Sequence, residues 1–348
     1  MKITVPTIDF GTSKIVTMVA QSNGERCDIV GSGAVPYSGY LQDGWNNPDE
    51  IRDVIRTAID QAQKTGNCRI HELNVGVPGM FTRVIVKEVH VSLTGPDPHV
   101  TAQDVRACFK LAEESGGDRI IHSAPAWFRV DDGKKTLSPV GIKGRELSAM
   151  IALVTADKYF IDDITYRLRD MDIEPREFYS TVAGEATYAL SQDERDKTAM
   201  LIDIGYLCTD VMVMEGDALI FHKCLDIGGG HISADIAEQL NIPFPFVEEK
   251  IKQTYSFNST NQDETYVIPA TEDEPARTVR RDEVTPIIEA KVEEIAEAIN
   301  KALEEGGVKL GKWSNVYLTG GGLILNKGGK DFLAGLSLIH ISEPTRRS

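Results

Sequence analysis

One short pattern occurs twice in this sequence and constrains the fold more than any other feature. An apolar, strand-like run ends in Asp9-x-Gly11 near the N-terminus, and a second such run ends in Asp203-x-Gly205 beyond the middle of the chain. Each copy continues with a strand-like run, a polar turn and a third strand-like run. One copy alone could be an ordinary hairpin turn. The repetition instead predicts two related lobes that face one cleft, each with a glycine turn able to approach phosphate.

The regular elements expected around these turns alternate between strand and helix, which indicates an α/β fold. Strand character covers residues 2–8, 15–20, 27–35, 73–77, 84–91, 120–130, 147–155, 198–204, 210–214, 218–225 and 316–319. Helical spacing covers residues 51–62, 101–113, 157–170, 231–240 and 246–255. The polar stretch 256–281 is predicted to be a hairpin or loop. Thr285 is predicted to cap a long amphipathic helix that has Pro286 at its first position.

The charge balance and the cysteines exclude several classes of protein. The 348 residues carry a formal net charge of −16, which argues against a general surface for nucleic acid or anionic membrane. The five cysteines have no C-x-x-C spacing, as expected for reduced intracellular thiols rather than a disulfide framework or a zinc site. The seven histidines show no paired metal spacing. Without a leader or an apolar run of about 18 residues, the chain is expected to be cytoplasmic.

The turn after Asp9 has a set of side chains suited to phosphate. Gly11 allows backbone amides to approach phosphate oxygens, Thr12 and Ser13 add hydroxyl donors, and Lys14 supplies a compact positive charge. Asp9 would orient water around Mg²⁺, because this ion keeps several waters and takes few protein carboxylates. The sequence therefore predicts that this turn binds the phosphates of a nucleotide.

Three stretches, IDFGTSK, IDIGYLCTD and YLTGGG, resemble the two phosphate motifs and the adenosine motif of the actin, sugar-kinase and heat-shock chaperone superfamily. Within it, the sequence is most similar to the FtsA family of bacterial cell-division proteins. The supporting stretches are GSGAVPYSGYLQDG, IHSAPAWFRVDDG, PVGIKGREL, LDIGGGHISADIA and IIEAKVEEIAEAI, and the likeness reaches about residue 326. It implies an α/β, actin-like two-lobed fold with duplicated ribonuclease-H-like subdomains and an inserted α/β subdomain in place of actin subdomain 1B.

The resemblance also implies a division of the chain. Subdomain 1A would take residues 1–83 and 165–192, the inserted subdomain 1C residues 84–164, subdomain 2A residues 193–230 and 288–326, and subdomain 2B residues 231–287. The tail, residues 337–348, does not continue the periodic pattern and resembles translated vector sequence. We therefore expect the native part to end near residue 336, before the amphipathic helix by which relatives reach the membrane.

Site residues follow from the same resemblance, position by position. Those facing the ATP phosphates would be Asp9, Gly11, Thr12, Ser13, Lys14, Asp203, Gly205, Tyr206 and Thr209. Those near ribose and adenine would be Gly229, Gly230, Glu249, Lys252, Gly320, Gly321 and Gly322, with Gly228 in the same turn. Asp9 and Asp203 would hold Mg²⁺ through water. A shift to Glu248 and Lys250 fits nearly as well as Glu249 and Lys252. Glu289 and Lys291 could also lie near the base, but the simpler interpretation is that they form the solvated face of a buried helix.

The sequence also departs from the superfamily pattern. Many relatives have Gly-Gly-Thr or Gly-Gln-Thr where this chain has Tyr206, Leu207 and Cys208, so a hydroxyl and backbone freedom are lost beside the γ-phosphate. Thr181 stands where chaperones have a catalytic Glu. Glu185 lies on the same expected helix, but one carboxylate with no identified water is a weak base candidate. ATP binding is therefore expected, hydrolysis is left open, and no general base is named.

The resemblance implies a division protein that binds ATP and Mg²⁺, polymerises, and recruits or anchors the tubulin-like protein FtsZ at the division site. FtsZ would bind through residues 231–287, and self-association and other divisome proteins would use the inserted subdomain. In the full-length protein, this activity is expected at the inner face of the cell membrane. Two alternatives remain: an actin-fold ATPase or small-molecule kinase, and a nucleotide-binding assembly protein for pili or enzyme reactivation. Binding of nucleic acid is not expected.

Overall fold

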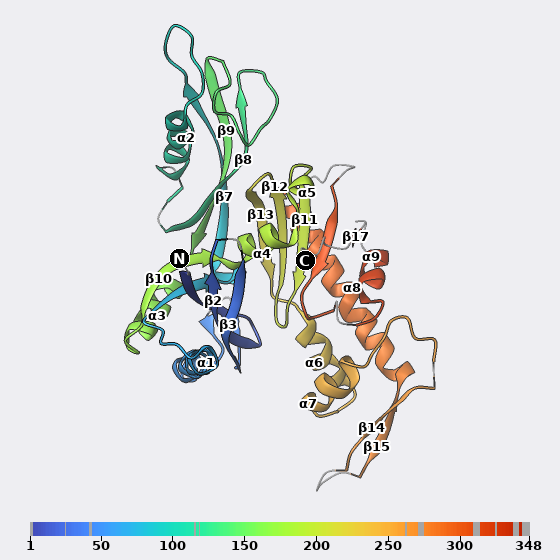
Figure 1. Cartoon of the computed structure of the whole chain (residues 1–348). Coiled ribbons are helices and arrows are strands. Elements are labelled where there is room, and N and C mark those ends of the chain that lie inside the picture. Colours follow the sequence, from blue (N-terminus) through green and yellow to red (C-terminus); the bar gives the residue numbers. More distant parts are fainter. Residues whose placement is uncertain are drawn as a thin grey trace. The chain divides into compact units, whose positions relative to one another are not determined.

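The computed structural model describes residues 3–24, 26–41, 44–114, 116–117, 119–261, 263–270, 275–308, 314–323, 326–336 and 341–342. The chain divides into two compact units. The first comprises Met1–Ala199 and Met212–His222, and the second comprises Met200–Val211 and Lys223–Pro344. Figure 1 labels many of the elements of each unit.

The N-terminal part of the first unit is built on a five-stranded sheet with the order β10-β6-β1-β2-β3. Its strands are β1 (Ile3–Phe10), β2 (Lys14–Ser22), β3 (Cys27–Pro36), β6 (Glu72–Val77) and β10 (Glu174–Ser180). β1 runs antiparallel to β2, and β1 and β10 both run parallel to β6. β1 thus lies at the centre of the sheet and delivers Asp9 at its C-terminal end.

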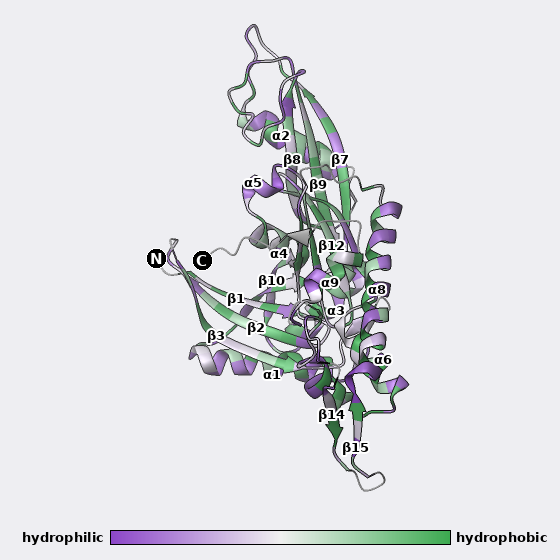
Figure 2. Ribbon diagram, turned by 90° about the vertical axis from the view of Figure 1, so that its right-hand side faces the viewer, coloured by the Kyte–Doolittle hydropathy of each residue, from purple (hydrophilic) through white to green (hydrophobic). Residues whose placement is uncertain are grey.

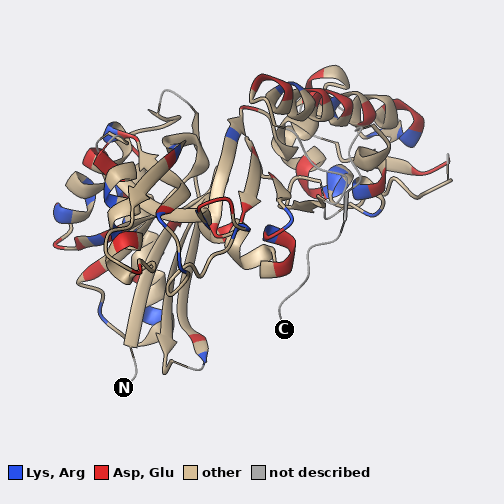
Figure 3. Cartoon of the chain, turned by 90° about the horizontal axis from the view of Figure 1, so that it is seen from above, with Lys and Arg blue, Asp and Glu red and all other residues tan. Residues whose placement is uncertain are grey.

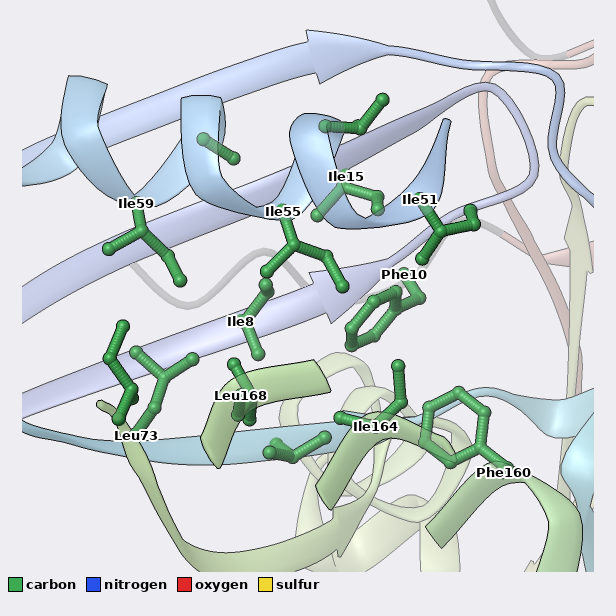
Figure 4. Packing of buried hydrophobic residues seen from close by; sticks show 14 of the residues in the cluster. Ile8, Phe10, Ile15, Ile51, Ile55, Ile59, Leu73, Phe160, Ile164 and Leu168 are labelled. Atoms are coloured by element: carbon green, nitrogen blue, oxygen red, sulfur yellow. The ribbon is translucent and has the colours of Figure 1, made fainter. Parts of the chain in front are cut away.

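Two helices cover this sheet with apolar side chains, as Figure 4 shows. Buried residues of α1 (Ile51–Gly66) and of α3 (Lys158–Arg169) pack with Ile8 and Phe10 of β1 in one core cluster. Gly33 of β3 makes the approach of α1 possible, since a Cβ atom there would lie 2.1 Å from the carbonyl oxygen of Ala58. This core immobilises the strand that carries Asp9.

A three-stranded antiparallel sheet with the order β7-β9-β8 forms the expected inserted module. Its elements are β7 (Thr82–Ser92), α2 (Ala102–Glu114), β8 (Ile120–Val130) and β9 (Glu146–Ala156). One cluster of buried residues joins α2 to this sheet. A second cluster, which includes Trp127, extends from the sheet to Ala218 and Ile220 of β13 (Ala218–Leu225).

The second repeat supplies a further sheet, whose strand order is β13-β12-β11-β16-β17. β11 (Ala199–Ile204) runs parallel to β16 (Val316–Thr319), with Asp203 opposite Thr319, and β12 spans Thr209–Glu215. β16 also runs parallel to β17 (Ile341–Ser342), which comes from the tail that resembles vector sequence. Among the helices of the second unit are α6 (Gly229–Gln239), α7 (Phe244–Phe246), α8 (Arg281–Glu305) and α9 (Gly329–Leu336).

The start of α8 differs from the prediction. The helix begins at Arg281, so Thr285 is not its cap and Pro286 lies inside the helix. The Glu283 carboxylate accepts a hydrogen bond from the backbone N–H of Arg280 (2.9 Å), an interaction typical of a helix N-terminus. The prediction was wrong because Pro286 is tolerated close to the N-terminus even when it is not the first residue. The bands of purple and green along α8 in Figure 2 reflect its amphipathic pattern.

Arg281 is buried and connects the start of α8 to its surroundings. Its backbone N–H donates to the carbonyl of Glu264 (2.9 Å), and its guanidinium donates to the Glu264 carboxylate (2.9 Å) and to the carbonyl of Ser256 (2.6 Å). The guanidinium carbon lies 4.3 Å from the ring centre of Tyr255. Glu264 immediately precedes β14 (Thr265–Ile268), which pairs with β15 (Arg277–Arg280), so the predicted hairpin within residues 256–281 is confirmed.

The expected strands and most expected helices are confirmed, although residue 2 lies outside the described residues. The helix predicted over 246–255 is confirmed only in part. α7 ends at Phe246 and is followed by a π-helical segment, η2 (Val247–Lys252), which ends before residue 255. Figure 3, in which the cartoon is coloured by charge, shows acidic and basic residues interspersed along the chain. Among the described residues, no helix is long and apolar enough to cross a membrane.

Candidate nucleotide site

The second Asp-x-Gly motif forms a tight turn between β11 and β12. The N–H of Gly205 donates to the carbonyl of Cys208 (2.9 Å), which closes the turn directly after Asp203. The hydroxyl of Thr209 is fully buried and donates to the carbonyl of Ile227 (2.7 Å). Thr209 therefore ties this turn to the glycine segment that follows β13.

Two glycine turns pack directly on the Asp203 turn. Gly229 and Gly230 donate their N–H groups to the carbonyls of Gly205 (2.9 Å) and Tyr206 (2.6 Å), and Gly322 donates to Ile204 (2.7 Å). These amides at the start of α6 are therefore engaged within the protein. The turns come so close that only glycine fits, and Gly229, Gly230 and Gly322 are themselves buried.

Gly320 shows how little room this packing leaves. Its φ of +94° lies in the left-handed region, and a Cβ atom would lie 2.1 Å from Oδ1 of Asp203. A Cβ atom on Gly229 would lie 2.4 Å from the Cα of Gly322, whereas Gly321 is exposed at the tip of its turn. The predicted adenosine turn therefore lies against the predicted phosphate turn within the second unit.

Lys252 approaches the same turn from η2. Its side chain is buried, and its ammonium lies 3.0 Å from the Glu248 carboxylate and 5.6 Å from the ring centre of Tyr206. Burial lowers the pKa of Lys252, while Glu248 acts in the opposite direction. Asn326 holds this segment by donating to the carbonyls of Lys252 (2.6 Å) and Tyr255 (2.9 Å).

The carboxylate beside Lys252 is Glu248, whereas the sequence pattern singled out Glu249. Glu249 is exposed, as is Lys250 of the shifted alternative. Spacing alone could not separate the two glutamates, because either lies within one helical turn of Lys252. On α8, Lys291 pairs with Asp235 of α6 (3.0 Å) and with Glu294 (2.5 Å).

The first Asp-x-Gly motif forms a corresponding turn between β1 and β2. The N–H of Gly11 donates to the carbonyl of Lys14 (3.1 Å). Two tyrosines support the turn from outside: the Tyr37 hydroxyl donates to the carbonyl of Gly11 (2.8 Å) and the Tyr40 hydroxyl to that of Phe10 (3.0 Å). These tyrosines belong to the stretch GSGAVPYSGYLQDG, in which the sequence gave no hint of this role.

The side chains of this turn range from buried to exposed. Thr12 is buried, Ser13 is half-buried and Lys14 is exposed. Among the described residues, neither Ser13 nor Lys14 has a side-chain hydrogen bond or ion pair. A hydroxyl and an ammonium are therefore available to a ligand at the tip of the turn.

Asp9 lies in a tight setting below the tip. Burial raises its pKa, although a hydrogen bond from the backbone N–H of Phe10 lowers it in part. Gly76 of β6 leaves room for the carboxylate, since a Cβ atom there would lie 3.3 Å from Oδ1 of Asp9 and 2.7 Å from the methyl group of Thr181. Thr181, the first residue of α4 (Thr181–Ala189), donates to the carbonyl of Val77 (3.0 Å), so its hydroxyl is already engaged.

Comparison with known families gives matches over most of the chain. The family described as "Cell division protein FtsA" matches residues 200–321, and "SHS2 domain inserted in FTSA" matches residues 79–155. The cell division protein FtsA of Pseudomonas aeruginosa is 26% identical over 320 residues, which cover 90% of this chain and 76% of that protein. FtsA of Bacillus subtilis is 26% identical over 86% of this chain and 70% of its own length. The chain belongs to the FtsA family.

Solved structures similar to this FtsA-family chain confirm the expected actin-like fold. The PilM-PilN type IV pilus biogenesis complex matches with a TM-score of 0.64 and 17% identity, over 99% of this chain and 88% of that one. MreB5 of Spiroplasma citri bound to ADP matches with a TM-score of 0.56 and 11% identity, over 98% and 92%. At such identities the likeness concerns the fold alone.

Within the second unit of the FtsA-family chain, most residues proposed for that lobe come together. Asp203, Gly205, Tyr206, Gly229, Gly230, Gly322 and Lys252 are linked by the contacts above. Within the first unit, Gly11 to Lys14 form one turn with Asp9 at its base. Gly76, Tyr37 and Tyr40 are additions that sequence reasoning missed, whereas Glu248 was its alternative to Glu249.

Proposed function

We propose that this FtsA-family protein binds ATP with Mg²⁺ and uses the nucleotide as a switch during cell division. The observation that carries the proposal is the packing of two glycine turns, Gly228–Gly230 and Gly320–Gly322, on the Asp203 turn. This arrangement brings glycine backbone, exposed at Gly321, close to the Asp203 carboxylate and to Tyr206, whose ring centre lies 5.6 Å from the ammonium of Lys252. A nucleotide that contacts such a surface can bias a protein between conformations through its differential contacts.

The residues of the two turns would have two roles: direct contact with phosphate and binding of Mg²⁺. Ser13 and Lys14 would contact phosphate oxygens, since a hydroxyl and an ammonium are suitable donors. Asp9 and Asp203 would hold Mg²⁺ through water, and the bound ion would neutralise phosphate charge. Burial raises the pKa of Asp9, which disfavours its ionised form. A bound cation would offset this effect, because a nearby positive charge favours the ionised carboxylate.

Gly229, Gly230 and the Gly320–Gly322 turn would contact the nucleoside by close backbone approach, because the amides of Gly229 and Gly230 are already engaged. Lys252, with Glu248 in place of the expected Glu249, would lie near the ribose. We propose no general base: the Thr181 hydroxyl is engaged with Val77. Slow hydrolysis or none is consistent with a switch.

The division role rests on family membership. We propose that the protein polymerises, recruits or anchors FtsZ through residues 231–287, and meets itself and other divisome proteins through the inserted module. The proposed four-subdomain division places the hairpin β14–β15 in the FtsZ-binding part. In the full-length protein, this activity would take place at the inner face of the cell membrane.

The test of nucleotide binding is calorimetric titration of ATP and ADP with and without Mg²⁺. Asp203→Ala and Lys14→Met should each weaken Mg-ATP binding by roughly tenfold or more, about 1.4 kcal/mol. Lys110→Met, on the exposed surface of α2, is the matched control and should bind as the parent does. Unchanged affinity in Asp203→Ala would remove the phosphate role from that turn.

The division role is tested separately by co-sedimentation of the protein with purified FtsZ. Binding is expected, and deletion of residues 269–276, between β14 and β15 in the sequence, should reduce it. Failure of the parent protein to bind FtsZ would contradict this role without affecting nucleotide binding. Phosphorylation of a small molecule would favour the kinase alternative, and association with pilus proteins would favour the assembly alternative.

A further inference from the structure

Two cysteines and an aspartate far apart in the sequence meet in the second unit. One ligand atom from each of Cys208, Asp210 and Cys224 lies within 4.8 Å of the other two. Cys208 ends the Asp203 turn, Asp210 follows in β12, and Cys224 comes from near the end of β13. Cys208 and Asp210 are buried, and Cys224 is half-buried.

The distances and the donor set suit one kind of ion. Zn²⁺ binds thiolate sulfur at about 2.3 Å and carboxylate oxygen at about 2.1 Å, so two sulfurs on one tetrahedral ion are about 3.8 Å apart. The spacing in this cluster allows that geometry with small side-chain movements. Sulfur ligands select thiophilic ions such as Zn²⁺ over Mg²⁺, which prefers oxygen ligands alone.

The backbone around the cluster is held by its own hydrogen bonds. The carbonyl of Cys208 accepts from Gly205 (2.9 Å), and Thr209, between Cys208 and Asp210, donates its hydroxyl to Ile227, three residues beyond Cys224. The segments that carry the three ligands are therefore fixed independently of any ion. A site on such segments needs little reorganisation to bind a metal.

We propose that Cys208, Asp210 and Cys224 form a binding site for Zn²⁺ or a similar thiophilic divalent ion, with water as a fourth ligand. On binding, two sulfur–metal bonds and one oxygen–metal bond form, and the protons of the two thiols pass to solvent. The resulting ion, with two thiolates and one carboxylate, carries a net charge of −1. This site shares no ligand with the proposed Mg²⁺ position, which uses Asp9 and Asp203.

The binding of such an ion would restrict the movement of the Asp203 turn. Cys208 would be anchored to Asp210 and Cys224 as well as to Gly205. This consequence rests on the proposed nucleotide role of the turn, whereas the metal site itself does not.

Cobalt provides a direct test, because Co²⁺ bound to thiolates gives a sulfur-to-metal absorption band in the near ultraviolet. The metal-free protein, kept reduced with a phosphine, should bind one equivalent of Co²⁺ with this band, and Zn²⁺ should abolish the band by displacement. Cys208→Ser and Cys224→Ser should each lose it, and Asp210→Asn should weaken Co²⁺ binding. Cys27→Ser and Cys68→Ser, outside the cluster, are the matched controls and should retain it.

Alkylation of the unmodified protein covers the case in which a variant fails to fold. Zn²⁺ should slow labelling of Cys208 and Cys224 by N-ethylmaleimide by at least tenfold and leave that of the exposed Cys27 unchanged. Three results would overturn the proposal: no thiolate band in the reduced protein, a band that persists in the Cys208→Ser, Cys224→Ser double variant, or equal labelling rates with and without Zn²⁺.

Discussion

The two Asp-x-Gly turns share one backbone design and differ in nearly everything around it. In each, the glycine N–H donates to the carbonyl three residues later, at 3.1 Å in the Asp9 turn and 2.9 Å in the Asp203 turn. Each turn joins the strand that carries the aspartate to the next strand. The strand–turn–strand unit therefore requires only the aspartate and the glycine to be alike.

The two turns are stabilised by different kinds of neighbouring group. Tyrosine hydroxyls support the Asp9 turn, and its tip carries Ser13 and Lys14. Glycine backbones pack on the Asp203 turn, and its tip carries Tyr206 and Leu207. Polar chemistry is thus concentrated on the first turn and close backbone packing on the second, so substitutions should affect the two turns differently.

The largest effect is expected from Gly320→Ala. The new methyl group would meet Asp203 at 2.1 Å on a residue whose φ is +94°, so overpacking and left-handed strain should together lower the free energy of unfolding by about 2–5 kcal/mol. Urea denaturation measures this. The matched control is Gly335→Ala in α9, where a Cβ atom would meet nothing within 4 Å, and a loss there of similar size would refute the packing explanation.

Glu248→Gln should be the next most harmful change. It leaves the buried ammonium of Lys252 without its carboxylate, and we expect a loss of about 1–3 kcal/mol in the free energy of unfolding. Glu249→Gln, one residue along and exposed, should change it by less than about 0.5 kcal/mol. If the two variants behaved in the opposite way, the pattern expected from sequence would be the correct one.

Tyr40→Phe tests the support of the Asp9 turn. The buried hydroxyl donates to Phe10, and its removal leaves a carbonyl unsatisfied, at a cost of about 1 kcal/mol. Thermal unfolding of the variant is compared with that of Tyr188→Phe, whose side chain is exposed and should contribute almost nothing. Equal melting temperatures for the two variants would show that the Asp9 turn does not need this tyrosine.

Asp9→Asn should give the smallest change, and one of opposite sign. Because burial raises the pKa of Asp9, folding favours the protonated carboxyl and is opposed by its ionisation. The stability that the protonated form contributes at low pH is lost as the pH rises through the folded-state pKa. The variant should therefore be more stable than the parent at pH 7.5 without ligand, and this advantage should shrink at acidic pH. Denaturation at both pH values measures it, with the exposed Asp49→Asn as control; a less stable variant at pH 7.5 would contradict the argument.

Much of the fold could be predicted from sequence because its elements follow simple periodicity. The strands before Asp9 and Asp203 are apolar runs, and the stripe of α1 has helical spacing. The start of α8 was misplaced because Thr285 and Pro286 look like a cap, whereas contacts of Arg281 with Glu264 help to set the true beginning. Such long-range contacts have no local pattern.

The site was predictable to a similar degree. Gly205 and Gly320 could be singled out because tight turns need glycine, and the structure gives both a close backbone neighbour. Glu248 could not be chosen over Glu249, since both spacings fit a helix. The meeting of Cys208 with Cys224 was missed, and the sequence predicted reduced thiols rather than a zinc site, because chain spacing says little about proximity across strands.

The buried Arg281 also has a consequence for local unfolding. It joins the first turn of α8, the residue before β14 and the loop at Ser256 through backbone and side-chain hydrogen bonds. Opening of the hairpin would expose this guanidinium and release the helix start, so the two should open as one cooperative unit. In hydrogen–deuterium exchange, the amides of β14, β15 and the first turns of α8 should therefore become labelled at a common rate.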